Sequence, residues 1–459
     1  MKMKKDNIYF NRREFIKATG VAAAATTAAM YGCVPRKDSP GVSGPVPADK
    51  MTYRSFPSLG DTVSLLGYGC MRWPTMPNPD GQGMVINQEV VNELVDYAIE
   101  HGVNYFDTAP VYVMGQSERA TGIALKRHPR EKFFIATKMS NHSITDFDAS
   151  VAIYKNSFEQ LQMDYIDYYL LHSIGSVGVR GFEARFVDNG LLDFLLKERE
   201  EGRIRHLGFS FHGVTEEFDK VLTFHEKVHW DFAQIQMNYS DWELASGRNI
   251  NADYLYKELS KRSIPVVVME PLLGGRLSNL PTYIVSRLKE QNPDASAASW
   301  AFRFVGSFEG VFTVLSGMTY MEHLQDNIRT YSPLTPLSEE QKEFLYETAK
   351  LMLQYPTIPC NDCDYCMPCP YGIDIPGVLL HYNKCINEGN VPKSNADTDY
   401  RKARRAYLVS YDRSVEKVRQ ADHCTGCKQC IELCPQKINI PVELRKLNEF
   451  IEQLKQETF

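Results

Sequence analysis

The sequence predicts an α/β protein: a (β/α)8 TIM barrel followed by a small α-helical domain rich in cysteine. Short β-rich runs alternate with helical patterns from Thr52 to Pro336, which is typical of a parallel sheet built from βα units. Eight such units fit a barrel, whose usual size is about 250 residues. Nine of the 11 cysteines then lie between Cys360 and Cys434. An open doubly wound sheet is the alternative, weakened by the lack of a Gly-x-Gly-x-x-Gly turn after the first strand.

The barrel strands are expected in eight β-rich runs, each followed by loop residues and a candidate helix. A hairpin that closes the bottom of the barrel is expected before them, from Thr52–Phe56 and Thr62–Ser64 around Gly60-Asp61. The runs are Leu65–Gly69, Tyr105–Asp107, Phe133–Thr137, Tyr165–Leu171, His206–Phe209, Phe232–Ile235, Pro265–Val268 and Val311–Leu315.

The composition excludes several classes of protein. The chain has 459 residues, of which 43% are hydrophobic and 24% charged, as in ordinary globular proteins. Its formal net charge is 51 − 57 = −6, which gives no sign of a nucleic-acid surface or a polybasic membrane patch. The body of the chain has no run of about 18 strongly apolar residues, the length that a membrane-spanning helix needs.

The first 33 residues are expected to be an export signal. Basic residues are followed by a bland Ala/Thr-rich segment, Ala18–Gly32. The stretch Asn11–Lys17, which contains Arg12 and Arg13, resembles a twin-arginine (Tat) signal. This resemblance implies export of a folded, cofactor-loaded protein to the periplasm by the twin-arginine machinery. A charged arm with a short amphipathic helix is the alternative.

The end of this segment offers a second hypothesis. Met30-Tyr31-Gly32-Cys33 resembles a lipoprotein cleavage box, so Cys33 would carry a lipid anchor. Ordinary signal cleavage near Ala28-Ala29 is the alternative. Residues 34–50 are rich in Pro, Gly, Ser and Lys and predict a flexible linker.

Four polar residues stand where the predicted barrel would place chemistry. Asp107 closes the second strand, Tyr112 lies in the loop after it, Lys138 follows the third strand and His172 the fourth. Because the carboxyl ends of parallel strands meet at one rim, these side chains should share one cleft. An ammonium beside a phenol stabilises the phenolate and lowers the phenol's pKa. We therefore expect Lys138, held by Asp107, to tune Tyr112, and His172 to orient a carbonyl oxygen.

The residues around these four positions resemble the aldo/keto reductase family over the whole barrel. The matching stretches are Tyr105–Tyr112, Ser117-Glu118, Ala136–Lys138 and Asp164–His172. The resemblance implies that Tyr112 is the proton donor, that Lys138 and Asp107 tune it, and that His172 positions the substrate for hydride transfer from a nicotinamide. A buried ion pair beside a hydrogen-bonded Tyr and His is the purely structural alternative.

The same resemblance implies cofactor contacts. Ser210 and Gln234 match positions that hold the nicotinamide carboxamide, but Phe211 and Met269 replace the usual Asn and the stacking Tyr. The stretch from Ser316 and Gly317 to Asn327 matches the adenosine-phosphate region. There, Gly317, Met318 and His323 stand where NADPH users place Lys, Ser and Arg, so NADH, NADPH or weak binding all stay open.

The C-terminal cysteines form two runs with iron-ligand spacing. The second has the bacterial ferredoxin pattern for a [4Fe-4S] cluster, and the first is one residue shorter in its last gap. Three close thiolates serve one cluster, and the fourth, before proline, serves the other. The predicted metal sites are Cys360, Cys363 and Cys366 with Cys434, and Cys424, Cys427 and Cys430 with Cys369. Zinc, or the loss of one cluster, are the alternatives.

The spacing of the runs, with helical patterns at Ile375–Asn383 and Arg401–Val418, resembles α-helical ferredoxins. The predicted domains are therefore 1–33 (signal), 34–50 (linker), 51–336 (barrel) and 337–459 (iron–sulfur domain).

Together these features predict an exported iron–sulfur oxidoreductase that reduces a small carbonyl compound or oxidises an alcohol, with the clusters as an electron relay and a redox protein as partner. The periplasm should lack a free nicotinamide pool, so either the nicotinamide is tightly bound or the clusters supply the electrons. An electron-transfer or redox-sensing subunit, whose barrel binds a ligand or partner without nicotinamide-dependent turnover, is the alternative.

Overall fold

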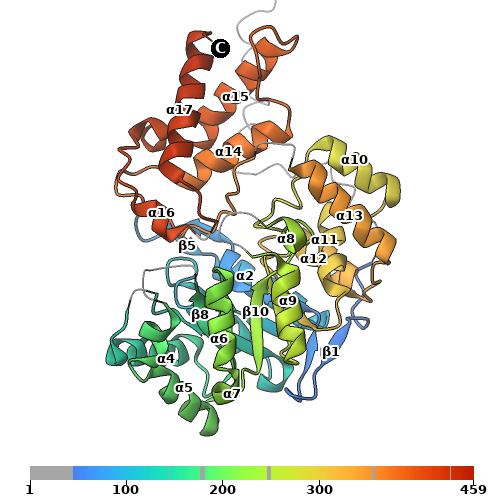
Figure 1. The fold of residues 1–459 in the computed structure, drawn as a ribbon, viewed down its shortest axis with the longest axis vertical. Coiled ribbons are helices and arrows are strands. Elements are labelled where there is room, and N and C mark those ends of the chain that lie inside the picture. Colours follow the sequence, from blue (N-terminus) through green and yellow to red (C-terminus); the bar gives the residue numbers. More distant parts are fainter. Residues whose placement is uncertain are drawn as a thin grey trace, which may run out of the picture. The chain divides into compact units, whose positions relative to one another are not determined.

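Eight parallel strands close into a barrel in the order β3-β6-β7-β8-β9-β10-β11-β12, and β12 pairs with β3 to complete the ring. The computed structural model describes residues 45–142, 144–175, 181–245, 250–353, 357–434 and 436–458. The predicted barrel and all eight of its strands are confirmed (Figure 1). The strands are β3 (Leu66–Gly69), β6 (Tyr105–Asp107), β7 (Phe134–Met139), β8 (Ile166–Ile174), β9 (Ile204–Phe211), β10 (Phe232–Gln236), β11 (Val266–Met269) and β12 (Val311–Ser316).

The predicted hairpin closes one end of the barrel. Strands β1 (Tyr53–Ser55) and β2 (Thr62–Ser64) pair antiparallel, and Val63 packs into the cluster of side chains that fills the barrel interior. The buried Asp61 carboxylate accepts a hydrogen bond from the Tyr168 hydroxyl at 2.8 Å. A second hairpin, β4 (Thr75–Pro77) with β5 (Met84–Ile86), extends from the loop after β3.

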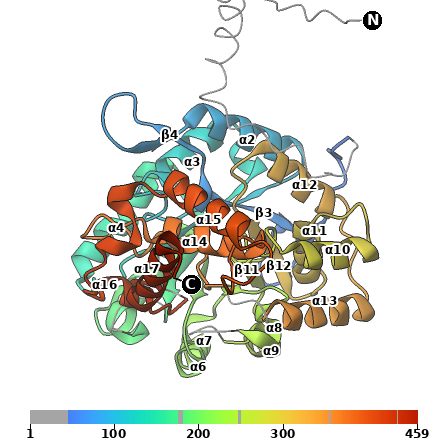
Figure 2. The same cartoon turned by 90° about the horizontal axis from the view of Figure 1, so that it is seen from above.

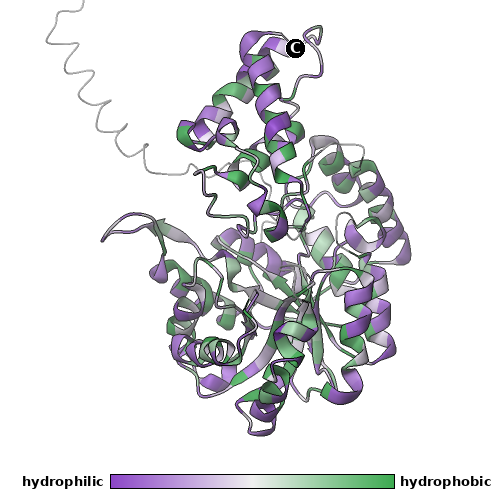
Figure 3. Cartoon of the chain, turned by 60° about the vertical axis from the view of Figure 1, so that its left-hand side comes forward, coloured by the Kyte–Doolittle hydropathy of each residue, from purple (hydrophilic) through white to green (hydrophobic). Residues whose placement is uncertain are grey.

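The outer helices lie around the barrel (Figure 2). They bury apolar residues against the strands and also carry hydrophilic residues (Figure 3). Side chains cap several of them; Asp146, for example, accepts from the Ala149 amide at the start of α4. These helices are α2 (Gln88–Glu100), α3 (Ser117–Leu125), α4 (Phe147–Leu161), α5 (Leu191–Glu200), α6 (Thr215–Thr223), α7 (His225–Val228), α8 (Asp241–Leu244), α9 (Ala252–Lys261), α10 (Thr282–Gln291), α11 (Ala297–Gly306), α12 (Met321–Tyr331) and α13 (Glu339–Met352), with short turns at Cys70–Arg72, Arg130–Lys132 and Glu183–Val187.

Helix α13 corrects the predicted domain boundary. Its Leu345 and Ala349 pack in the barrel's core, together with Leu337. The barrel therefore extends to the end of α13, and the boundary at residue 336 is one helix too early because the apolar face of that helix belongs to the barrel.

The remaining helices gather around a second apolar core formed by side chains such as Leu379, Tyr407 and Leu447. The two helices expected between the cysteine runs are present as α14 (Ile375–Asn387) and α15 (Tyr400–Ser414) (Figure 1). They are followed by α16 (Gln429–Leu433) and α17 (Ile440–Gln456), with short turns at Lys417–Arg419 and Ala421–His423. The likeness of this helical region to ferredoxins stays a prediction.

A membrane-spanning helix must be both long and apolar, and none of the helices in the described residues meets both conditions. The predicted export signal (1–33), with Cys33, and most of the predicted linker (34–50) lie outside the described residues.

Candidate active site

The four predicted residues lie together at the carboxyl ends of their strands. The Lys138 ammonium donates to Asp107 Oδ1, and to the Thr108 carbonyl at 2.7 Å. It also lies over the face of the Tyr112 ring, 4.9 Å from the centroid. The His172 ring meets that of Tyr112 edge to face, with 5.9 Å between centroids. All of these side chains are buried.

The backbone around this group is unusual. Val113 and Met114 follow Tyr112 with φ of 48° and 53°, and Ser173 follows His172 with φ of 55°. Non-glycine residues seldom take such values, which carry a conformational cost and concentrate at functional sites. The fold therefore holds Tyr112 and His172 at positions that an ordinary loop would not adopt.

Ser117 and Glu118 support the site from helix α3. The Ser117 hydroxyl donates to the Cys70 carbonyl at 2.8 Å, and Glu118 accepts from Thr137 at 2.6 Å. These bonds tie the first turn of the helix to the ends of β3 and β7. The resemblance at these two residues thus corresponds to a structural role beside the site.

Burial controls the proton chemistry of the group. It raises the pKa of Tyr112 well above its ordinary value, and the Asp107 carboxylate raises it further. The net pKa of Tyr112 is therefore raised rather than lowered as predicted, because removing the phenol from water has a larger effect than the neighbouring Lys138 ammonium. Burial also raises the pKa of Asp107, although Lys138 opposes this shift.

His172 is neutral at physiological pH. Burial lowers its pKa well below the ordinary value, and the nearby His142, Lys138 and Arg185 add to the effect. Its Nδ1 lies 2.6 Å from the Ser140 hydroxyl. If Ser140 donates to Nδ1, Nε2 carries the ring proton and can donate it to a substrate oxygen.

The two predicted carboxamide contacts, Ser210 and Gln234, lie on the neighbouring strands β9 and β10. Ser210 Oγ accepts from the Ser173 amide at 2.7 Å. Gln234 Nε2 approaches the Met269 sulfur at 3.7 Å, while its buried Oε1 has no hydrogen-bond partner among the described residues. Gln234 thus offers a free acceptor, as a carboxamide N–H would require.

The predicted adenosine-phosphate contacts are used differently. Asn327 Nδ2 donates to Ser316 Oγ at 3.0 Å, and both side chains are buried. Gly317 lies under the side chain of Arg72, whose atoms would be 3.2 Å from a Cβ at Gly317. The structure therefore brings Ser316, Gly317 and Asn327 together at the end of β12 but covers the glycine with an arginine.

Comparison with known proteins agrees with this geometry. The model of the aldo/keto reductase family matches residues 65–347. The chain belongs to the aldo/keto reductase family. The uncharacterised oxidoreductase YqkF of Bacillus subtilis is 25% identical over 61% of this chain and 91% of its own length. The L-galactose dehydrogenase of Arabidopsis thaliana is 25% identical over 64% of this chain and 92% of its own.

The solved structure of the aldo-keto reductase AKR11C1 from Bacillus halodurans (holo form) shares the fold. Its TM-score is 0.52 at 22% identity, covering 65% of this chain and 96% of that one. Family membership and the oxidoreductase relatives identify the present chain as an oxidoreductase enzyme. Aldo/keto reductases typically use NAD(P)H and act on small carbonyl compounds or alcohols.

This aldo/keto reductase carries a feature at its site that the sequence did not predict. The Arg72 guanidinium donates to the carbonyls of Asn361 and Asp362, at 2.8 and 3.1 Å, and pairs with the Asp362 carboxylate at 3.2 Å. Asn361 Nδ2 donates to Glu270 Oε1 at 3.0 Å. The first cysteine run therefore lies on the rim of the barrel, between the ends of β3 and β11.

Glu270 was not among the predicted site residues, because the family resemblance gave a role there only to Met269, the residue before it, at the position that usually stacks on the nicotinamide ring. It has φ of 56°, and its Oε2 is buried without a partner among the described residues. Burial raises its pKa to about 7. A strained, half-satisfied buried carboxyl is a frequent mark of a functional site.

Tyr365, between Cys363 and Cys366, reaches the catalytic group. Its ring lies 6.3 Å from that of His142, which lies 4.9 Å from that of His172. Burial raises the pKa of Tyr365 above its ordinary value, and the nearby Cys363, Glu270 and Asp107 raise it further. The aromatic rings thus form a continuous path from the cysteine run to the predicted proton donor.

The cysteines fall into two neighbouring sets, and none of those in the described residues forms a disulfide. Three from the first run share one small cavity with one from the second: Cys360, Cys363, Cys366 and Cys434. In the other set, burial raises the pKa of Cys430 to about 11, and the nearby thiols of Cys427, Cys424 and Cys369 add to the shift. The grouping follows the predicted pairing.

The described residues contain no group of three or more His, Cys, Asp or Glu side chains arranged to hold a single metal ion. A four-iron cluster is larger than one ion, so its thiolates stand farther apart around it. Cluster binding stays a prediction.

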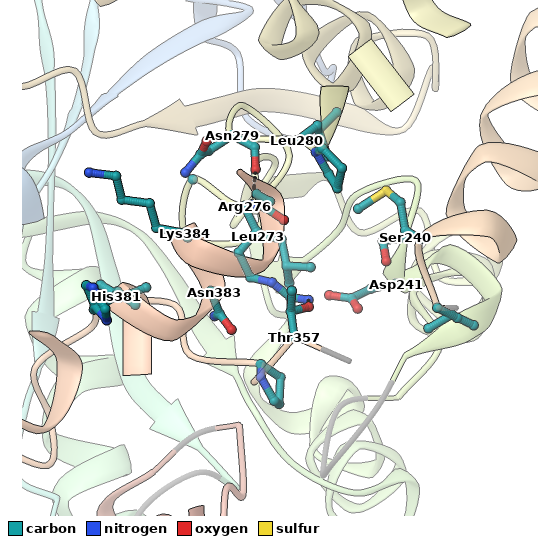
Figure 4. A pocket seen from close by; sticks show the side chains of 18 of the residues that line it. Ser240, Asp241, Leu273, Arg276, Asn279, Leu280, Thr357, His381, Asn383 and Lys384 are labelled. Atoms are coloured by element: carbon teal, nitrogen blue, oxygen red, sulfur yellow. Dashed lines mark hydrogen bonds between the residues drawn. The ribbon is translucent and has the colours of Figure 1, made fainter. Parts of the chain in front are cut away.

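A separate cavity of about 610 Å³ lies between the loop after β11 and the C-terminal helices (Figure 4). Arg276, Asp241 and Lys384 are among its polar lining residues. Arg276 donates to the Thr357 hydroxyl at 3.1 Å. No sequence motif predicted this cavity.

Proposed function

We propose that this aldo/keto reductase interconverts a small carbonyl compound and its alcohol, with Tyr112 as the proton donor. The supporting observation is the position of the Lys138 ammonium. It is held by Asp107 and the Thr108 carbonyl and lies over the Tyr112 ring. A phenolate formed at Tyr112 would lie beside a cation that is already held in position, so the site would not have to reorganise to stabilise the negative charge.

The proton chemistry follows from the protonation states. Tyr112 begins as a neutral phenol, because burial raises its pKa, and can give its proton to a carbonyl oxygen. Lys138 then stabilises the phenolate. Neutral His172, held through Nδ1 by Ser140, can donate from Nε2 to the same oxygen. Asp107 holds Lys138 in place.

The reducing partner is a distinct question. The sequence predicts hydride transfer from NADH or NADPH, and the free Gln234 Oε1 supports a carboxamide there. The rim, however, does not fit the dinucleotide as a whole, because Arg72 and the first cysteine run occupy it. With a nicotinamide, a hydride would add to the carbonyl carbon while Tyr112 protonates the oxygen. With the clusters, two single electrons would be needed, and a second proton would have to reach the carbon in addition to the one that Tyr112 gives to the oxygen.

We further propose two [4Fe-4S] clusters as the electron relay, held by the two cysteine sets. The cavity that Cys360, Cys363, Cys366 and Cys434 line together supports the first cluster. The second cluster is supported by three thiols that lie close enough to Cys430 to raise its pKa further, those of Cys427, Cys424 and Cys369. When bound, such clusters supply single electrons at potentials tuned by burial and hydrogen bonding.

Export to the periplasm by the twin-arginine route is the remaining part of the proposal, with Cys33 as a candidate lipid anchor. Replacing Arg12 and Arg13 by Lys should leave the protein in the cytoplasm, as measured by fractionation. A normal periplasmic yield of the double variant would refute the signal assignment. Loss of membrane association in Cys33→Ala would support the anchor, and unchanged association would refute it.

The proposed catalytic role is tested with Tyr112→Phe. A panel of small aldehydes and ketones is assayed with reduced methyl viologen and, in parallel, with NADPH. We expect turnover to fall by about 10²- to 10⁴-fold, the usual loss for a positioned acid. Iron content should stay unchanged. Tyr283→Phe, at a tyrosine on α10 that is 37% exposed, is the matched control. Turnover of Tyr112→Phe within about threefold of the parent would remove Tyr112 from this role.

An electron-transfer or redox-sensing subunit is the second candidate. The observation that favours it is the placement of the first cysteine run on the barrel rim, beside Tyr112. In that case Tyr112→Phe should leave electron transfer from the reduced protein to an acceptor dye unchanged, and no carbonyl compound should be turned over.

A further inference from the structure

The segment Asn361–Tyr365 is attached to the barrel rim at several points. Arg72, after β3, holds two of its carbonyls and one of its carboxylates. Glu270, after β11, accepts from Asn361. Gly274, in the loop after β11, lies so close to Asn361 that a methyl group there would overlap its backbone. The segment therefore bridges the first and seventh strand ends across the eighth.

A bound dinucleotide would have to cross the same place. Its carboxamide end is expected at Ser210 and Gln234, on β9 and β10, and its adenosine-phosphate end at Gly317 and Asn327, after β12. The stretch between them, which contains the diphosphate, would pass over the ends of β11 and β12. Arg72 covers Gly317 there, with side-chain atoms 3.2 Å from the position of a Cβ.

The charges at this place also oppose a diphosphate. The bridging segment brings the carboxylates of Asp362 and Asp364, and Glu270 lies beneath it. Arg72, the arginine after β3, already pairs with Asp362. Arg276 lines the separate cavity together with Asp241 (Figure 4). Among the described residues that join this segment to the rim, a diphosphate would thus meet carboxyl groups and a guanidinium that is already paired.

We propose that Asn361–Tyr365 takes the place of the dinucleotide in this aldo/keto reductase, so that no exchangeable NADH or NADPH reaches Tyr112. The redox group adjoining the site is then the one that Cys360, Cys363, Cys366 and Cys434 would hold. This inference rests on the proposed function only in taking the group around Tyr112 as the reaction site.

Tyr365 gives the replacement a structural logic. It lies between two cysteines of the first set, and its ring lies 6.3 Å from that of His142. The cysteine run thus supplies an aromatic ring beside the histidines of the site. Arg72 and Gly274 contact this segment directly, so the segment already covers the part of the rim that a dinucleotide would cross.

The experiment uses the full-length chain, purified anaerobically with its iron. Bound nucleotide is first sought by heat denaturation and chromatography. The protein is then titrated with NADH and with NADPH by isothermal calorimetry and by fluorescence quenching. Iron content and a cooperative thermal transition show that the sample is folded and loaded. We expect no co-purified nucleotide and no saturable binding up to about 1 mM.

Stoichiometric NAD(H) or NADP(H) in the purified protein, or saturable binding with a Kd below about 1 mM, would overturn the inference. Such a result would leave the proposed function intact, because Tyr112 could then act with a nicotinamide. Conversely, unchanged viologen-driven turnover of Tyr112→Phe would refute the proposed function and leave the nucleotide result unaffected. The two failures are therefore distinguishable.

Discussion

Arg72→Ala should release the first cysteine run from the barrel rim without unfolding the barrel. The variant loses two hydrogen bonds from a charged donor to the carbonyls of Asn361 and Asp362, and one ion pair. The ion pair adds little, because the side chains are 33% and 39% exposed. Together with the hydrogen bonds, the free energy by which Arg72 holds the segment on the rim is about 2–4 kcal/mol after allowance for this exposure.

That energy corresponds to an increase of about 30- to 1,000-fold in the local opening of residues 358–367. Hydrogen exchange followed by mass spectrometry measures this opening. The amides of Cys360 and Met367, which donate to Ile358 and Asp364 at 2.8 Å, report it directly. Arg72→Lys should recover only part of the protection, because an ammonium cannot bond both carbonyls as the planar guanidinium does.

Arg127→Ala is the matched control. Arg127 is also a partly exposed arginine paired with an aspartate, Asp96, but it lies on the outer helices. It should leave exchange at residues 358–367 unchanged. If exchange there in Arg72→Ala stays within about threefold of the parent, the segment is held by other contacts and the reasoning about its attachment fails.

Three further results are expected. Gly122→Ala should lower the free energy of unfolding by about 1–3 kcal/mol, because the new methyl group would lie 2.5 Å from the Leu161 carbonyl oxygen; an unchanged denaturant midpoint would contradict this packing. Burial lowers the pKa of His142 to about 4, so stability should be level above about pH 7 and fall as the pH drops from 6.5 towards 4, by about 2 kcal/mol at pH 5. Denaturation at pH 7 and pH 5 measures this slope, and His142→Gln should reduce it; an equal slope in the variant would assign the loss to other groups. Cys434→Ser should lower the iron content by about half, whereas Cys385→Ser should not, and equal iron in both variants would refute the assignment of Cys434 as a ligand.

The barrel and its central group were readable from local patterns. Buried parallel strands appear as short β-rich runs, and polar residues just after such runs must meet at one rim, since parallel strands end on the same side. This placed Asp107, Tyr112, Lys138 and His172 together, as the structure does. Within each cysteine run the spacing likewise predicted which thiols lie near one another, because a short loop limits where its side chains can reach. The placement of Cys434 with the first run followed instead from the ferredoxin pattern.

The tertiary structure alone decided what covers this group. The bond from Arg72 to Asn361 joins residues 289 positions apart, and no local pattern encodes such a pairing. The same holds for the shift of the Tyr112 pKa. The sequence shows that an ammonium stands near the phenol, but the cost of removing the phenol from water depends on everything packed around it. Periodicity and spacing are properties of neighbouring residues, whereas desolvation and the closing of a rim are properties of the assembled fold.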